Sequence, residues 1–195
     1  MKTPHRQVLA LAATALLALG LAACGGSGDS SSSTTDSGAT SAFVPKPHSD
    51  SGGGSEPFIV AGGDNSIQEY GGEASDSEFE QAATTLHNFL DARAEGNWAA
   101  ACTYMSPVLI KSLEELATHT KGLKGCAEIL DRLTPPKGKG ALRLEAAQAN
   151  VASLRVHGKQ AFLIYTGPKG AVIAMGMTPE GGIWKVSNLD GIALN

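Results

Sequence analysis

Apolar positions in the second half of the chain follow first a helical period and then an alternating one. Between Ser77 and Gly96 the apolar side chains recur every three or four residues, at Phe79, Ala82, Ala83, Leu86, Phe89 and Leu90. This spacing places them on one face of a helix. Ser77 is followed by Glu80 at the spacing of a capping box, so we expect the helix to begin at Ser77 and to end near Gly96.

Three shorter helices are predicted before the proline pair at 135–136. Asn97 can cap a helix over residues 98–104, and Ser106 before Pro107 is typical of another helix start. A fourth helix is predicted over residues 125–133. The two prolines are expected to end the helical region.

Short apolar runs separated by glycine-rich turns follow the prolines. They predict four strands, over residues 142–156, 161–166, 171–177 and 183–189. The connections are short, which favours an antiparallel meander. Helices followed by strands predict an α+β domain over residues 75–195, in which the N-terminal helices pack on a curved antiparallel sheet.

The start of the chain has a different pattern. Lys2 and Arg6 precede an apolar run over residues 8–21, which is shorter than the roughly 20 residues of a membrane-spanning helix. The run ends in Leu21-Ala22-Ala23-Cys24, which resembles the cleavage box (lipobox) of bacterial lipoproteins. We therefore predict a signal peptide over residues 1–23 and a lipid on the Cys24 thiol. An ordinary secreted protein with a chance cysteine is the alternative.

A lipid on Cys24 predicts where the protein works. Two acyl chains suffice for stable anchoring, so the expected location is the extracytoplasmic face of the bacterial cell membrane. Residues 24–74 are rich in glycine, serine and acidic side chains and poor in aliphatic ones, which predicts a disordered tether. Ten acidic residues and one basic residue lie between Cys24 and Glu80, against nine acidic and twelve basic residues from Gln81 onward.

The basic residues of the domain concentrate in one stretch. They are Lys121, Lys124, Arg132, Lys137, Lys139 and Arg143. Such a cluster favours an anionic partner, which outside the cytoplasm is a lipid headgroup, a wall polymer or the acidic tether itself. A solvated basic face is the simpler interpretation. The compartment and the lack of aromatic residues in this stretch argue against nucleic acid.

One part of the tether, residues 58–71, is less polar than the rest. It carries Phe58, Ile59, Val60, Ile67 and Tyr70 between turn residues. This pattern is compatible with an extended segment that docks on a sheet edge or in a groove, either of this domain or of a partner. A sticky piece of linker is the other interpretation.

Two cysteines remain once Cys24 is assigned to lipid. Cys102 and Cys126 lie on neighbouring predicted helices, and paired cysteines outside the cytoplasm usually form a disulfide. Two cysteines without clustered histidines make a poor metal site, and no C-x-x-C pair suggests redox exchange. We therefore predict a structural disulfide and no metal.

The order of elements resembles the nuclear-transport-factor-2-like superfamily of cone-shaped (cystatin-like) domains, in particular its lipid-anchored actinobacterial members. The resemblance covers about Ser77 to Leu189. It rests on residues 89–98 leading to Cys102, on 125–127, on 151–158 and on 182–186. It implies a pocket between the helices and the concave sheet, whose lining would include Phe89, Trp98, Tyr104, Tyr165 and Met175. Each of these also suits a plain core.

Candidate catalytic groups are scattered. His87 and Asp91 are four residues apart on the first predicted helix and suit a solvated helix surface, while His119 and His157 fall in a polar helix end and a turn. Tyr104 and Tyr165 have no partnered carboxylate, and no nucleophile, phosphate-loop or cofactor motif is present.

These patterns favour a non-enzymatic, lipid-anchored domain without a cofactor. It would bind a partner protein or another component of the cell envelope. A carrier or sensor of a small apolar molecule in the cone pocket is the first alternative. An isomerase or dehydratase of the same fold is the second, which a buried carboxylate facing a tyrosine would favour.

Overall fold

The computed structural model describes residues 42–118 and 122–194, which belong to one compact unit of the chain. Cys24, His119 and Lys121 lie outside the described residues, as do the predicted signal peptide and the first part of the predicted tether. Within the described part, no helix combines the length and apolar character needed to cross a bilayer.

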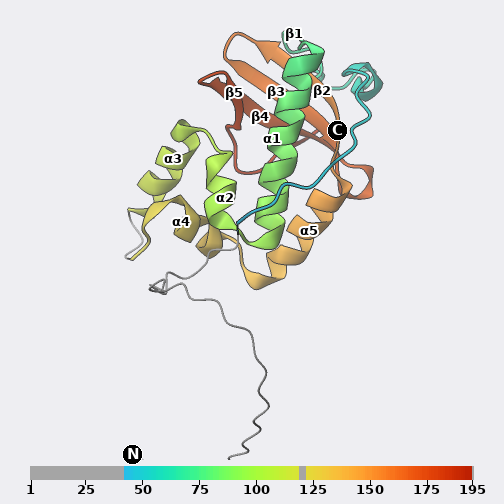
Figure 1. Ribbon diagram of the computed structural model, residues 1–195. Helices are drawn as coiled ribbons and strands as arrows, with labels where there is room; N and C mark the ends of the chain where they lie inside the picture. Colours follow the sequence, from blue (N-terminus) through green and yellow to red (C-terminus); the bar gives the residue numbers. More distant parts are fainter. Residues whose placement is uncertain (1–41, 119–121, 195) are drawn as a thin grey trace, which may run out of the picture. The chain divides into compact units, whose positions relative to one another are not determined.

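The longest helix, α1 (Asp76–Glu95), crosses one face of the sheet (Figure 1). Its capping box is formed by Ser75 and Glu78, two residues earlier than the predicted pair of Ser77 and Glu80. Both serines have a glutamate three residues later, so the sequence pattern permits either. The Ala74 amide still donates to the Leu154 carbonyl, so the chain leaves the sheet just before Ser75 and turns there into the helix.

The next three helices confirm the predicted starts. Gly96 ends α1 in the left-handed conformation, and the Asn97 side chain caps α2 (Trp98–Thr103). Ser106 caps α3 (Pro107–Ala117), and α4 (Gly125–Leu133) has the predicted bounds. Side-chain caps therefore set the starts of α2 and α3, whereas α4 begins without one.

The first predicted strand is wrong over residues 142–148. After the short η2 (Pro136–Gly138) the chain forms a further helix, α5 (Lys139–Gln148). Ala146 and Ala149 are buried while Arg143 and Leu144 are exposed, which is the three-residue repeat of a helix and not the alternation of a strand. Alanine, leucine, glutamate and glutamine also favour a helix here. The proline pair ends α4 but does not end the helical region.

A curved antiparallel sheet follows, which confirms the α+β class. Four strands form the predicted meander: β2 (Asn150–His157), β3 (Gln160–Thr166), β4 (Val172–Glu180) and β5 (Ile183–Val186). The last predicted strand, 183–189, stops at Val186. The chain then returns as β6 (Ile192–Leu194) to pair with β4, and β1 (Gly72–Glu73) pairs with β2. Neither β1 nor β6 was predicted.

The core lies between α1 and the sheet. Along β3 the side chains alternate, so Leu163 and Tyr165 face the core that includes Leu86 and Phe89 of α1. Ile164 faces the opposite side of the sheet and is fully buried there. Both faces of the central strands are therefore covered.

Residues 42–74 correct the prediction of a disordered tether, which extended to residue 74. They lie on the folded domain, and η1 (Glu56–Phe58) and β1 fall within them. The Gly52 and Gly54 amides donate to the Val151 and Ala152 carbonyls, so this segment and β1 together cover the outer edge of β2. The low aliphatic content misled the prediction, because hydrogen bonds to a free sheet edge hold this segment.

The segment over residues 58–71 docks on this domain, one of the two alternatives that its sequence left open. The Tyr70 ring packs edge-on against Phe162, and its hydroxyl bonds the Gln160 side chain. Arg155 donates to the Tyr70 and Gly71 carbonyls. These contacts fasten the segment to the side of the sheet opposite α1.

Candidate functional site

Residues 42–54, which we call the strap, run antiparallel to α1 in an extended conformation. Lys46 pairs with Glu95, the last residue of α1, at 2.7 Å. His48 bonds Asp91 one helical turn earlier, and Asp50 bonds His87 a further turn earlier. Two residues of extended chain cover about 6.6 Å and four residues of helix about 6 Å, so alternate strap residues match every fourth residue of α1.

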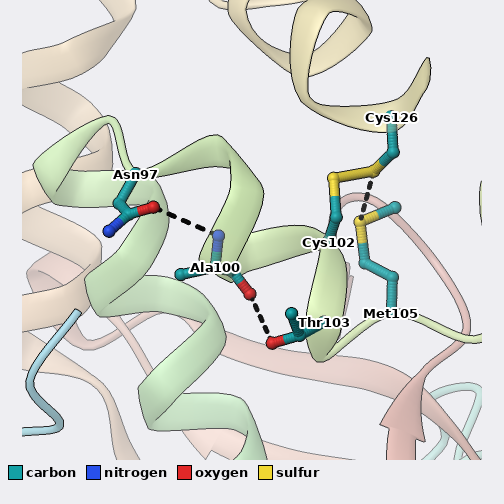
Figure 2. The surroundings of a disulfide bond; sticks show 6 residues. All are labelled: Asn97, Ala100, Cys102, Thr103, Met105 and Cys126. Atoms are coloured by element: carbon teal, nitrogen blue, oxygen red, sulfur yellow. Dashed lines mark hydrogen bonds between the residues drawn. A yellow bond between two sulfur atoms is a disulfide. The ribbon is translucent and has the colours of Figure 1, made fainter. Parts of the chain in front are cut away.

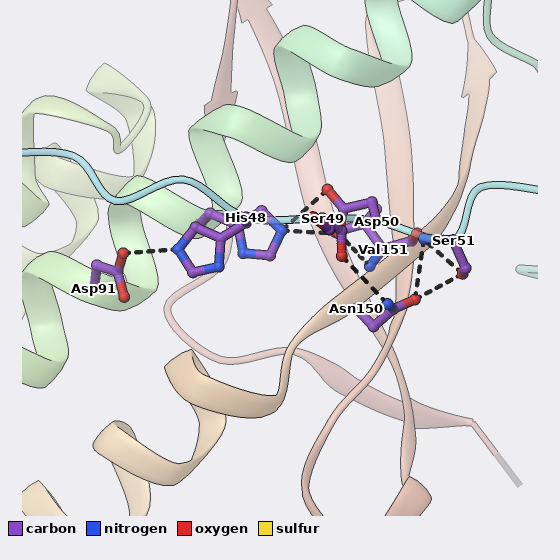
Figure 3. A network of polar contacts seen from close by, with 8 residues as sticks. His48, Ser49, Asp50, Ser51, Asp91, Asn150 and Val151 are labelled. Atoms are coloured by element: carbon purple, nitrogen blue, oxygen red, sulfur yellow. Dashed lines mark hydrogen bonds and ion pairs between the residues drawn. The ribbon is translucent and has the colours of Figure 1, made fainter.

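The centre of this contact is a cluster of two histidines and two aspartates (Figure 3). His48 Nε2 lies 2.8 Å from Asp91 Oδ2, and His87 Nε2 lies 2.9 Å from Asp50 Oδ1. The two imidazole rings stack at 3.9 Å between centroids with an interplanar angle of 8°. Each aspartate therefore faces a histidine of the other segment, and we call these four residues the His–Asp cluster.

Asp50 is also tied to the sheet. Its Oδ1 accepts a hydrogen bond of 2.7 Å from the Val151 amide, the first core residue of β2. Burial raises the pKa of the Asp50 carboxyl, but the hydrogen bonds from His87 and Val151 outweigh it and leave the pKa below its usual range. Because a carboxylate only accepts, His87 Nε2 carries the proton, and His87 Nδ1 is buried without a partner among the described residues.

A polar hollow lies beside the cluster. Its volume is about 500 Å³, and it is lined by strap residues 46–50 and by the face of α1 from Phe79 to Asn88. A second hollow of about 530 Å³ lies along strap residues 52–54 and shares Phe79 with the first. Both hollows are on the surface of the domain, and the strap forms one wall of each.

The structure places His87 and Asp91 differently from the sequence-based expectation of a solvated helix surface. Both side chains are 3% exposed, because the strap covers them. The missed signal is the repeat Lys46, His48 and Asp50, whose charges complement the acidic and histidine positions of α1 in antiparallel order. His157 is exposed at the turn after β2, as expected.

The predicted disulfide between Cys102 and Cys126 is present (Figure 2), with an S–S distance of 1.98 Å. It joins the end of α2 to the start of α4. The Met105 sulfur lies 3.9 Å from Cys126 Sγ in the same buried region. The bond therefore holds α2 and α4 against one another.

The five residues that the family resemblance places in a pocket lie in or against the core. Phe89, Tyr165 and Met175 are fully buried, and Trp98 is nearly so, with its Nε1 donating to Asp131. Tyr104 is half-buried and packs edge-on against Phe43 of the strap. None of the five lines either hollow beside the strap.

One of these residues faces a carboxylate. The Tyr165 hydroxyl donates to Glu145 of α5 at 2.8 Å. Burial, together with the nearby negative charge of Glu145, raises the pKa of Tyr165 strongly. The ring is fully enclosed by the core, so this contact satisfies a buried hydroxyl that would otherwise lack a partner.

The predicted basic cluster divides into two places. Lys124 precedes α4, whereas Arg132, Lys137, Lys139 and Arg143 lie around the connection from α4 to α5. Among the described residues, no group of three or more histidine, cysteine or acidic side chains is placed to hold a metal ion.

Comparison with known proteins adds no assignment. No family model, no curated protein and no solved structure matches this chain.

Proposed function

We propose that this protein is a lipid-anchored domain on the extracytoplasmic face of the bacterial membrane, and that it binds another component of the cell envelope without catalysing a reaction. The lipobox ending in Cys24 supports the anchor. The fold supports the binding role, because the two hollows beside the strap lie on the surface of the domain, where a partner can reach them.

The observation that carries the binding role is the closed interior. Leu86, Phe89, Tyr165 and Met175 have almost no exposed surface and belong to one hydrophobic core. The two hollows beside the strap lie on the surface; the one at His48 and Asp50 is the more polar, and the one along residues 52–54 has a mixed lining. A closed interior with surface hollows suits recognition of a partner better than transport of an apolar molecule.

We also place the domain among the cone-shaped, nuclear-transport-factor-2-like folds. The support is a long first helix laid across a curved antiparallel meander, with shorter helices after it. This assignment leaves the activity open, because one fold hosts many functions.

An enzyme of the same fold is the second candidate, and the contact between Tyr165 and Glu145 is the observation that favours it. Tyr165 and Glu145 form the tyrosine–carboxylate pair that such an enzyme would need. Its chemistry would require Glu145 to move away so that a substrate could reach the hydroxyl. The carrier alternative would likewise require the core to open.

The anchor is tested by replacing Cys24 with alanine in the full chain and fractionating the cells that produce it. We expect the natural chain to be extracted from membranes only by detergent, with a mass that includes the lipid. The variant should carry no lipid. A natural chain without lipid would contradict the proposal.

A further inference from the structure

The connection from α4 to α5 combines exposed cations with exposed leucines. Arg132, Lys137 and Arg143 are exposed and Lys139 is half-buried, while Leu133 and Leu144 are 48% and 44% exposed. We call these six residues the basic end. Isolated exposed leucines are ordinary, but two of them in one stretch that also carries four cations are typical of a segment that meets a lipid bilayer.

The cations of the basic end form no salt bridge with the acidic residues that the structure describes. Within residues 42–118 and 122–194, none of the four is in an ion pair. The two acidic residues that flank the stretch are engaged elsewhere, since Asp131 accepts from Trp98 and Glu145 accepts from Tyr165. The positive charge is therefore available to an external anion.

The strap and the basic end meet the same end of α1. Lys46 reaches Glu95, the last residue of α1, and Trp98 just beyond it holds Asp131, the neighbour of Arg132. Figure 1 shows the α4–α5 connection at this end of the domain. The first residues of the strap and the α4–α5 connection therefore lie at the same end of α1. Seventeen residues lie between Cys24 and Ala42, which limits the distance from the proposed anchor to the domain to about 60 Å.

We propose that the basic end docks the domain on the anionic membrane surface in which Cys24 is anchored. This inference rests on the proposed anchor for its setting. Headgroup phosphates would neutralise the four cations, and Leu133 and Leu144 would enter the interfacial layer. Anchoring keeps the basic end close to the surface, so even a weak interaction holds the domain down.

Vesicle sedimentation tests the docking without the lipid. Residues 24–195 with Cys24→Ser include the whole compact unit and can be mixed with phosphatidylcholine vesicles, with or without phosphatidylglycerol. We expect binding only to the vesicles that contain phosphatidylglycerol, and binding that weakens as salt is added. Absence of binding to those vesicles would overturn the docking, while the anchor would still stand or fall on the lipid at Cys24.

Two charge-matched variants make the test specific. Replacement of Lys137, Lys139 and Arg143 by glutamine should weaken binding about a hundredfold, since each cation near an anionic surface contributes about one kcal/mol. The control replaces three exposed lysines elsewhere, Lys111, Lys159 and Lys169, by glutamine. An equal loss of vesicle binding in the two variants would mean that only the net charge of the protein matters, and it would overturn the proposal.

Two further measurements separate the remaining outcomes. Leu133→Ser with Leu144→Ser should weaken vesicle binding several-fold, because both side chains are exposed and neither is part of the core. Soluble polyphosphate serves as a model of an anionic wall polymer. Tighter binding to polyphosphate than to anionic vesicles would overturn the proposal of membrane docking and favour an anionic polymer as the partner.

Discussion

At the scale of single residues, the His–Asp cluster determines how the strap is held. Asp50 joins three parts of the molecule, because it lies on the strap and accepts hydrogen bonds from His87 of α1 and from the Val151 amide of β2. Hydrogen bonds to a charged, partly buried group contribute more to stability than exposed ion pairs do. Asp50 is therefore the residue whose loss should affect the strap most.

Asp50→Asn should lower the free energy of unfolding by about 1–3 kcal/mol, because it removes the charge while keeping an oxygen for the Val151 amide. Urea unfolding of the variant and the natural chain measures the difference. Glu69→Gln is a matched control, since Glu69 is exposed and bonded only through its backbone. Equal losses in the two variants would exclude a special role for Asp50.

The stability difference between the natural chain and Asp50→Asn should depend on pH. Hydrogen bonds lower the pKa of Asp50 in the folded state, so the stability that it contributes is present above the ordinary carboxyl pKa of about 3.9 and is lost as pH falls through the lower folded value. The difference in free energy of unfolding between the natural chain and Asp50→Asn should shrink as the pH falls below about 4. A difference that grows on acidification would contradict this sign.

At the scale of elements, local chemistry in the sequence predicts most helices and part of the sheet. Capping residues such as Asn97 and Ser106 mark helix starts that the structure confirms. Residues 142–148 were mistaken for strand because a short run with leucines and alanines fits either period. The strap and β1 were not predicted, because their partners α1 and β2 are distant in the sequence. Amino-acid composition alone does not indicate which distant segments pair.

The docking of residues 55–74 can be tested at one glycine. Gly71 has a φ of 55°, and a Cβ there would collide with the Val156 carbonyl of β2. Gly71→Ala should therefore lower the free energy of unfolding by at least about 2 kcal/mol. Gly72→Ala is the control, because nothing lies within 4 Å of its Cβ position and its φ is not positive. Equal melting temperatures for the two variants would mean that the segment does not dock.

The disulfide should stabilise the helical side of the domain. Cys102 and Cys126 are 24 residues apart, and closing a loop of this size contributes about 3 kcal/mol in the chain-entropy account. Replacing both by alanine should lower the free energy of unfolding by about that amount. Reduction of the natural chain should have a similar effect, and an unchanged unfolding midpoint after reduction would contradict the prediction.

At the scale of the whole molecule, the protein combines a proposed lipid anchor, a strap and a domain with a closed core. The sequence alone predicts the anchor at Cys24, and the structure adds that the first part of the strap lies at the C-terminal end of α1. The strap then continues along α1 to the edge of β2. Tension on the proposed anchor would therefore act first on the packing of Phe43 against Tyr104 and then on the contact between Lys46 and Glu95.

The most direct test of the central claim is the intact mass of the full chain extracted from membranes, measured under denaturing and native conditions. The account predicts a denatured mass that begins at Cys24, carries acyl chains and is two protons light for the disulfide. The native mass of the chain should be the same, because the core is closed. A denatured mass without lipid would contradict the anchor, and extra native mass that disappears on denaturation would contradict the closed interior.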